Sequence, residues 1–292
     1  MQELKGVGVA MVTPFMDIGA IDYPALKNLI ELYVEQGIDF LVVLGTTAEV
    51  VTLSPEEKNE ILRSVVNYNR GRLPLVAGMG GNNTAVLVKE IKDTNLDGYS
   101  AILSVCPYYN RPNQEGIFQH FSAVAAASPL PVVLYNVPSR TAASIANETT
   151  LRLIKAHKNI IGIKDASADM ALGAALIEAA PDHFLILSGD DATALNLCEI
   201  GGDGVISVIA GALPKQFATL IHHGLKGEAV PAQVLQEQIR PMIDLLFEEG
   251  NPTGLKALLA HQNRCVNHLR LPLVKASTSL QNRIKVGYSK LV

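Results

Sequence analysis

Short apolar segments recur along most of the chain, each followed by a helical pattern, and this alternation constrains the fold more than any other feature. Eight segments are rich in β-branched or other apolar residues; they cover residues 7–12, 40–44, 73–77, 101–105, 132–135, 160–163, 184–187 and 205–208. They are almost continuously apolar, as parallel strands are when helices cover both faces of their sheet. Eight such units in succession predict an α/β fold, a (β/α)8 TIM barrel.

After residue 210 the strand pattern ends, and the remaining sequence shows helical patterns broken by glycine and proline. We therefore expect a (β/α)8 barrel over residues 1–212 and a C-terminal helical extension over residues 213–292, packed on the barrel. A doubly wound open sheet is the alternative, but it usually has fewer strands, and no Gly-x-Gly-x-x-Gly follows the first segment. The N-terminal apolar run has no small-residue cleavage site, so we expect a first strand there rather than a leader.

One lysine lies within the sixth predicted strand, in the run Ile-Ile-Gly-Ile-Lys-Asp at residues 160–165. A buried ammonium is costly, and burial favours the neutral amine, which is a nucleophile toward carbonyl carbons. Taken alone, a salt-bridged lysine, or one whose ammonium reaches solvent at a strand end, is the commoner explanation. Lys164 therefore indicates Schiff-base chemistry only if its surroundings support it.

In barrels of this kind the active site forms at the C-terminal ends of the strands. Tyr135 and Lys164 are about one βα unit apart, so they should project from adjacent strands into the same barrel mouth. Polar residues gather at this end of most strands: Thr46 and Thr47 after the second, Tyr108 and Tyr109 after the fourth, Arg140 just beyond the fifth, and Gly189, Asp190 and Asp191 after the seventh. Hydroxyl groups and an arginine should therefore converge on the lysine.

Each of these residues also has an ordinary structural explanation. The turn at residues 45–47 can cradle a small carboxylate with N–H groups and hydroxyls, or it can be a simple strand exit. Tyr135 can shuttle protons or only pack its ring, and Arg140 can hold a carboxylate bidentately or lie on the surface. We interpret Asp190 and Asp191 as helix caps rather than metal ligands.

Composition argues against several classes of partner. The net charge is −4 and no basic stripe is present, which argues against nucleic acid or an anionic membrane. No run is long and apolar enough to span a bilayer. The seven histidines show no metal-ligand spacing, so we expect no metal. Cys106, Cys198 and Cys265 lack CxxC spacing, which favours a reducing cytoplasm.

Five motifs taken together resemble one family across the whole chain. They are Gly-Thr-Thr-Ala-Glu at 45–49, Cys-Pro-Tyr-Tyr-Asn-Arg-Pro at 106–112, Tyr-Asn-Val-Pro-Ser-Arg-Thr at 135–141, Gly-Ile-Lys-Asp at 162–165 and Ser-Gly-Asp-Asp at 188–191. In this order they resemble the 4-hydroxy-tetrahydrodipicolinate synthases, also called dihydrodipicolinate synthases, of the pyruvate-lysine class I aldolase superfamily. The tail segment Leu-Arg-Leu-Pro-Leu at 269–273 is similar to the C-terminal region of the same family.

The resemblance implies a lyase that condenses pyruvate with L-aspartate 4-semialdehyde, the entry step to diaminopimelate and lysine. Lys164 would form an imine with the keto carbon of pyruvate, so no separate cofactor is implied. Tyr135 would carry protons, with Thr46 or Thr47 and Tyr109 completing a relay. In this family the second tyrosine comes from a neighbouring subunit, so Tyr109 would act across a dimer interface, normally within a tetramer built from dimers.

By the same resemblance, Thr47, Gly189 and Ile206 match pyruvate-contacting positions, and Arg140 matches the position that receives the carboxylate of the semialdehyde. N-acetylneuraminate lyase and keto-deoxy sugar acid aldolases share the lysine and the tyrosine. The segment at 139–141 and the second threonine suit a short amino-acid aldehyde better than a sugar. A non-catalytic small-molecule binding barrel could dispense with the lysine, but here lysine, tyrosine and threonines are all present.

The chain departs from the family pattern in two places. Gly-Thr-Thr-Gly-Glu-Ser is replaced by Gly-Thr-Thr-Ala-Glu-Val, and Ala48 fits this turn only if its φ is negative. In members inhibited by lysine, an interface site uses histidines and a glutamate at positions that here hold Pro55, Lys58 and Val86. The lysine ammonium would lose its acidic partner and meet a cation, so we predict weak or no feedback inhibition by lysine.

Overall fold

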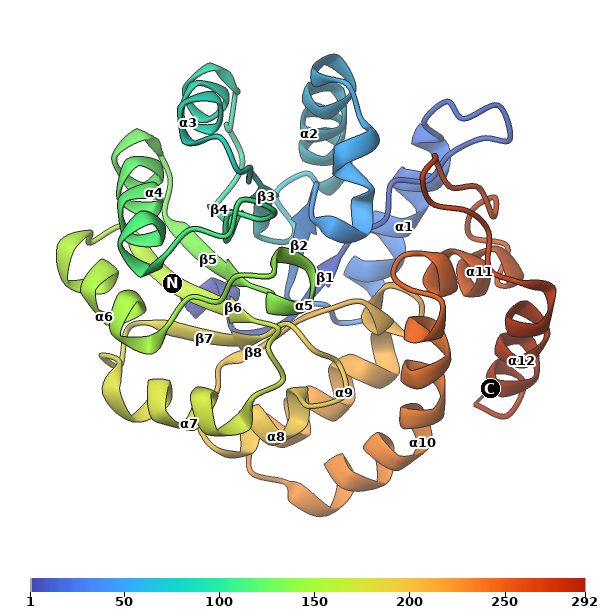
Figure 1. Cartoon of the computed structure of the whole chain (residues 1–292). Helices are drawn as coiled ribbons and strands as arrows, with labels where there is room; N and C mark the ends of the chain where they lie inside the picture. The colour runs from blue at the N-terminus through green and yellow to red at the C-terminus, as the bar shows by residue number, and fades with distance from the viewer. Residues whose placement is uncertain (1, 292) are drawn as a thin grey trace.

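Eight parallel strands close into a barrel in which each strand pairs with its neighbours in chain order (Figure 1). The structure is a computed structural model that describes residues 2–291. The strands are β1 (Gly6–Ala10), β2 (Phe40–Val43), β3 (Leu75–Gly78), β4 (Ala101–Val105), β5 (Val132–Asn136), β6 (Ile160–Asp165), β7 (Leu185–Ser188) and β8 (Gly204–Ser207). They lie close to the eight predicted segments, so the predicted (β/α)8 barrel is confirmed.

Alternate residues of each strand enter two different hydrophobic cores. Val133, Tyr135 and Ile161 belong to the cluster inside the barrel. Leu134, between Val133 and Tyr135 in sequence, belongs to the cluster between the strands and the helices, and so does Ile163. Ile161 and Ile163 lie on opposite sides because the register between β5 and β6 shifts at Ile161. Because side chains alternate along a strand, this pattern explains why the strands are apolar on both faces. The same alternation directs Lys164, the residue after Ile163, toward the barrel interior.

Helices pack around the outside of the barrel. They are α1 (Tyr23–Glu35), α2 (Pro55–Asn69), α3 (Thr84–Asp93), α4 (Gln114–Ala127), α6 (Asn147–Ala156), α7 (Met170–Ala179), α8 (Ala194–Glu199) and α9 (Pro214–Leu225). The short helix α5 (Pro138–Thr141) lies instead at the barrel mouth (Figure 1). Short 3-10 helices lie between them: η1 (Gln2–Leu4), η2 (Thr46–Ala48), η3 (Val50–Thr52) and η4 (Ile209–Gly211). The start of α2 carries a full capping box, in which Ser54 and Glu57 satisfy each other's backbone N–H groups.

Three further helices form the C-terminal extension, α10 (Ala229–Glu248), α11 (Thr253–His261) and α12 (Thr278–Tyr288). They gather along one side of the barrel, shown from orange to red (Figure 1). Helix α9 packs against β1 and β8, which makes it the eighth helix of the barrel by position. The division at residues 212 and 213 remains a prediction. Within residues 2–291, no helix is long and apolar enough to cross a membrane.

A buried ion pair fastens the extension to the loop after β2. Lys256 of α11 is 0% exposed, and its Nζ donates to Oε1 of Glu49 at 2.5 Å and to the His268 carbonyl at 2.9 Å. Oε2 of Glu49 accepts from the Arg270 N–H at 2.9 Å. The Arg270 guanidinium also donates bidentately to Glu57, at 2.7 and 2.6 Å. Since a buried charge is tolerated only when it is paired, these contacts lock the extension to the barrel mouth.

Candidate active site

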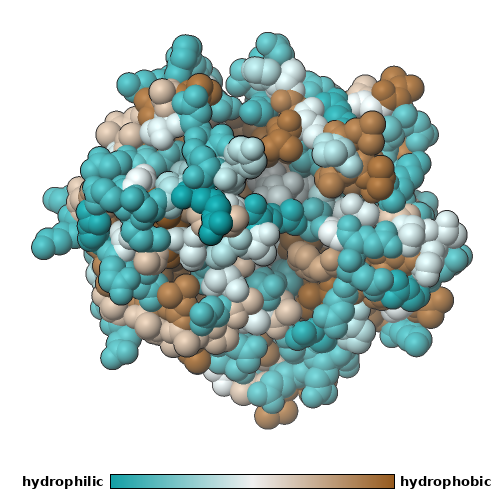
Figure 2. Space-filling model, viewed as in Figure 1, coloured by the Kyte–Doolittle hydropathy of each residue, from teal (hydrophilic) through white to brown (hydrophobic). Residues whose placement is uncertain are grey.

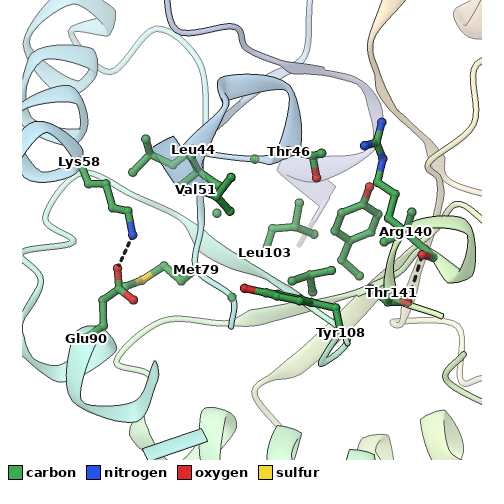
Figure 3. Close-up of a pocket in the computed structure, with 17 residues that line it drawn as sticks. Leu44, Thr46, Val51, Lys58, Met79, Glu90, Leu103, Tyr108, Arg140 and Thr141 are labelled. Carbon is green, nitrogen blue, oxygen red and sulfur yellow. Dashed lines mark hydrogen bonds and ion pairs between the residues drawn. The ribbon is translucent and has the colours of Figure 1, made fainter. Parts of the chain in front are cut away.

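Two adjoining cavities open at the C-terminal ends of the strands, where Figure 2 shows a hollow in this face. The inner cavity, of about 160 Å³, contains most of the predicted site residues in its lining: Thr46, Thr47, Tyr135, Arg140, Lys164 and Gly189. The outer cavity, of about 250 Å³, shares Thr46, Tyr135 and Arg140 with it. The close-up of the outer cavity shows Thr46 and Arg140 at one end and Lys58 with Glu90 at the other (Figure 3). The fold therefore brings these predicted residues together.

Lys164 is buried without a counter-charge. Its side chain is 6% exposed, and its Nζ lies 4.3 Å from the centre of the Tyr135 ring, on the strand position that pairs directly with Tyr135. No carboxylate among residues 2–291 lies within ion-pair distance of Nζ. Neighbouring Asp165 points to the other face of β6, where it accepts hydrogen bonds from Asn136 at 2.8 Å and Ser167 at 2.7 Å. A salt-bridged Lys164 is therefore excluded within the described chain.

Gly189 leaves the space that the Lys164 side chain occupies. A Cβ at position 189 would lie 2.8 Å from Lys164 Cε and 2.7 Å from the Ala166 Cβ. The Gly189 N–H donates to the Asp165 carbonyl at 2.6 Å, so the backbone cannot easily move away. The glycine is thus required by the position of the lysine rather than by an unusual φ.

The threonine turn after β2 is a 3-10 helix, η2, and the residues that flank it have positive φ values. Leu44 before it and Glu49 after it have φ values of 60° and 55°. Ala48 lies inside η2 and has a negative φ, so alanine can replace the family's glycine in this turn without backbone strain. Thr47 is buried, and its Oγ1 accepts a hydrogen bond from Asn251 Nδ2 at 3.0 Å.

Arg140 lies on the short helix α5, where its guanidinium is exposed at the rim of both cavities. Among the described residues the guanidinium makes one hydrogen bond, to the Asn251 carbonyl at 3.4 Å. Within residues 2–291 it forms no ion pair with an acidic side chain. Because its fork of donors is almost unused, Arg140 can bind a carboxylate bidentately.

Ile206 and Tyr109 do not line either cavity. Ile206 is buried in the barrel interior, and Val208, two residues further along, lines the inner cavity instead. Tyr109 is 89% exposed with a φ of 73°. The loop that carries it is tied to the loop after β3, since Asn82 donates to the Tyr108 carbonyl at 3.2 Å. A single chain therefore holds Tyr109 in the solvent.

The prediction that Asp190 and Asp191 cap a helix is wrong. Helix α8 begins at Ala194, and Asp190 bonds instead to Thr193 in the preceding turn. Asp191 is buried and accepts from the backbone N–H groups of Val208 and Ile209, at 3.1 and 2.8 Å. Burial raises the pKa of Asp191 to about 6. Its carboxylate therefore fixes the loop after β8, a partner that local sequence does not reveal.

Cys106 does not line either cavity, and the described residues form no metal site. Cys106 is fully buried, and burial raises the pKa of its thiol to about 12, so a reactive thiolate is disfavoured. Residues 2–291 contain no group of three histidine, cysteine or acidic side chains arranged to hold a metal ion.

Asn251 is the site residue that the sequence did not reveal. It lies between α10 and α11 and lines the inner cavity. In the sequence it stands only in a Gly-Asn-Pro helix break, and its single signal is a polar residue inside that break.

Fold and site together define a (β/α)8 barrel with a buried, unpaired lysine facing a small cavity that can hold carboxylates. The model of the dihydrodipicolinate synthetase family matches residues 3–290, and this chain belongs to that family. The resemblance stated from the five motifs is therefore confirmed.

Relatives match over nearly the full length. The 4-hydroxy-tetrahydrodipicolinate synthase of Flavobacterium psychrophilum is 48% identical over 291 residues, which cover 100% of this chain and 99% of the relative. The dihydrodipicolinate synthase of Acinetobacter baumannii, solved in complex with pyruvate, is 36% identical with a TM-score of 0.96, covering 99% of both chains. The enzyme of Cyanidioschyzon merolae, solved with lysine bound, is 33% identical with a TM-score of 0.95 and the same coverage.

Gly189→Ala should destabilise the protein, because the new methyl group overlaps the Lys164 side chain. We expect the free energy of unfolding to fall by about 1–3 kcal/mol in urea titrations. Gly81→Ala is the matched control, since no atom lies within 4 Å of its added Cβ and its φ is not positive. Equal stability of the two variants would show that Gly189 is not needed to accommodate the lysine.

Proposed function

We propose that this chain condenses pyruvate with L-aspartate 4-semialdehyde, the reaction of a 4-hydroxy-tetrahydrodipicolinate synthase. The observation that carries the proposal is the buried, unpaired Lys164 beside Tyr135 in the inner cavity. Family membership over residues 3–290 supports it. The imine that Lys164 forms is itself the electron sink, so the chemistry needs no separate cofactor. We also assign the enzyme to the cytoplasm, since its cysteines lack the spacing of a disulfide framework.

The reaction begins at the Lys164 amine. Nζ attacks the keto carbon of pyruvate, and loss of water gives an imine. The imine withdraws electrons from the adjacent methyl group, which loses a proton and becomes an enamine. The enamine carbon then attacks the aldehyde carbon of the semialdehyde, which regenerates the imine and gives an alkoxide that takes up a proton. Attack of the semialdehyde's own amine on the imine carbon then closes the ring and frees Lys164. Tyr135, whose ring lies against Nζ, would carry the protons, with Thr46 or Thr47 next in the relay.

The two substrates carry carboxylates, and the cavity offers a separate group for each. Thr47 and Gly189 border the space beside Lys164, where pyruvate would bind. Ile206 belongs to the apolar interior cluster that also contains Tyr135, and would support the cavity wall from within the barrel rather than line the cavity. Arg140, further out at the rim, would hold the carboxylate of the semialdehyde.

Tyr109 would complete the relay of a second subunit. A non-glycine residue with positive φ costs about 1–3 kcal/mol and persists only where its surroundings hold it there, and no part of residues 2–291 buries this side chain. Val51, an apolar side chain of the outer cavity wall, is 82% exposed. We therefore assign this rim to a homodimer interface, within a tetramer built from dimers.

The purified chain should consume pyruvate together with L-aspartate 4-semialdehyde and should not cleave N-acetylneuraminate. Spectrophotometric product formation and pyruvate release are the two measurements. Lys164→Ala is the control and should abolish the condensation, because no other lysine among residues 2–291 lines the inner cavity. Cleavage of N-acetylneuraminate without condensation would contradict the proposal and favour the sugar acid lyases of the same superfamily.

Mixing two inactive variants tests whether Tyr109 acts across the interface. Tyr109→Phe keeps the lysine and Lys164→Ala keeps the tyrosine, so a mixed dimer contains one complete site. After subunit exchange, activity should recover to about a quarter of wild type, since random pairing completes one site in four. Mixed dimers confirmed by native mass spectrometry but without recovered activity would show that Tyr109 acts in the site of its own chain, and a fully active Tyr109→Phe variant would place it outside the site.

Feedback inhibition by L-lysine should be weak or absent. The structure corrects one premise from the sequence: Lys58 is not a free cation, since its Nζ lies 3.2 Å from Glu90 Oε1 (Figure 3). The pair leaves Glu90 already neutralised, and exposed Val86 supplies no acid for a ligand ammonium. Initial rates should therefore remain near the uninhibited value at sub-millimolar L-lysine. Half-inhibition in that range would contradict the prediction.

A further inference from the structure

Asn251 joins the two carboxylate-binding groups of the proposed site through different atoms. Its side-chain Nδ2 donates to Thr47 Oγ1 at 3.0 Å. Its backbone carbonyl accepts from Arg140 Nη2 at 3.4 Å. Asn251 is 7% exposed and lines the inner cavity with Lys164. A residue of the C-terminal extension thus reaches the site between its two substrate positions.

The direction of the Asn251 hydrogen bond determines what the Thr47 hydroxyl can do. A hydroxyl carries one proton to donate and lone pairs with which to accept. Because the Asn251 amide donates to Thr47 Oγ1, the hydroxyl proton is not used in this contact. Thr47 donates to no acceptor within residues 2–291. Its proton is therefore available to an anion in the cavity.

A packing role alone does not account for an amide at this position. Asn251 Oδ1 is buried and has no hydrogen-bond partner among residues 2–291. An unsatisfied buried acceptor costs stability, whereas an apolar side chain of similar size would not carry that cost. The amide carries this cost while its Nδ2 group bonds to Thr47, which points to a function for the Nδ2 contact.

We propose that Asn251 is a positioning residue that holds Thr47 as a hydrogen-bond donor toward the carboxylate of pyruvate. This inference rests on the proposed function. The extension contacts the threonine turn at two points: Asn251 bonds to Thr47, and Lys256 pairs with Glu49, two residues further along. The C-terminal helices therefore set the geometry of the pyruvate cradle as well as covering the barrel.

Asn251→Asp and Asn251→Ala separate donor direction from packing. An ionised aspartate has the shape of asparagine but only accepts, so Thr47 would donate to it and turn its lone pairs toward the substrate. We expect the KM for pyruvate to rise about 10- to 100-fold in Asn251→Asp, as when a hydrogen bond to a charged group is lost, and less in Asn251→Ala. The KM for the semialdehyde should stay within about twofold of wild type, because Arg140 bonds to the backbone carbonyl, which both variants retain.

A double-mutant cycle removes the direct effect of the new charge. In a Thr47→Val background, Asn251→Asp can act on pyruvate only through its charge, so its effect on KM should be much smaller than in wild type. Asn282→Asp, on an exposed position of α12, adds the same charge away from the site and should leave both KM values unchanged. Circular dichroism of each variant establishes that the fold is retained.

The outcomes distinguish the inference from the proposed function. If Asn251→Asp behaves as wild type while Asn251→Ala is impaired, the residue acts by packing and the inference is overturned. An equal effect of Asn251→Asp with and without the Thr47 hydroxyl would overturn it as well. If wild type itself forms no imine with pyruvate, the proposed function fails, and the inference fails with it.

Discussion

The site depends on one constraint: a lysine side chain is held inside the barrel without a counter-charge. Lys256 shows how the same chain treats a buried ammonium elsewhere, pairing it with Glu49 and a carbonyl oxygen. Lys164 has the Tyr135 ring as its neighbour instead of a carboxylate. The cost of burying this group is not offset by an ion pair, so the amine is left available for bond formation. The difference between the two lysines is the basis of the proposed chemistry.

Several features of the barrel follow from this arrangement. Strand alternation turns Lys164 inward and Asp165 outward, where Asn136 and Ser167 bind the carboxylate. Gly189 on the next strand end leaves room for the lysine stem. The extension then fixes the threonine turn on the other side of the cavity. Its Asn251 bonds to Thr47 within the turn, and its Lys256 bonds to Glu49 at the end of the turn. Barrel and extension thus contribute to one cavity.

The sequence predicted what depends on local pattern and on the order of the strands. Apolar runs alternating with helices are local signals, and the parallel order of a barrel places the ends of all strands at one mouth. Tyr135 and Lys164 could therefore be placed together before any coordinates, and the structure pairs them in register.

Contacts between distant segments could not be predicted in the same way. Asn251 and Thr47 are separated by 204 positions, and Lys256 and Glu49 by 207. Asp191 shows the same limit, because its adjacent acid suggested a helix cap whereas its partners lie on the loop after β8. Tyr109 differs again, since its place in the proposed relay depends on a second chain.

Trapping the imine tests the central claim most directly. The protein is incubated with pyruvate, reduced with borohydride, and digested for peptide mapping by mass spectrometry. The account predicts one modified residue, Lys164, with the fully buried and ion-paired Lys256 unmodified. Modification of Lys256, or an unmodified Lys164 in protein that turns over pyruvate, would contradict it.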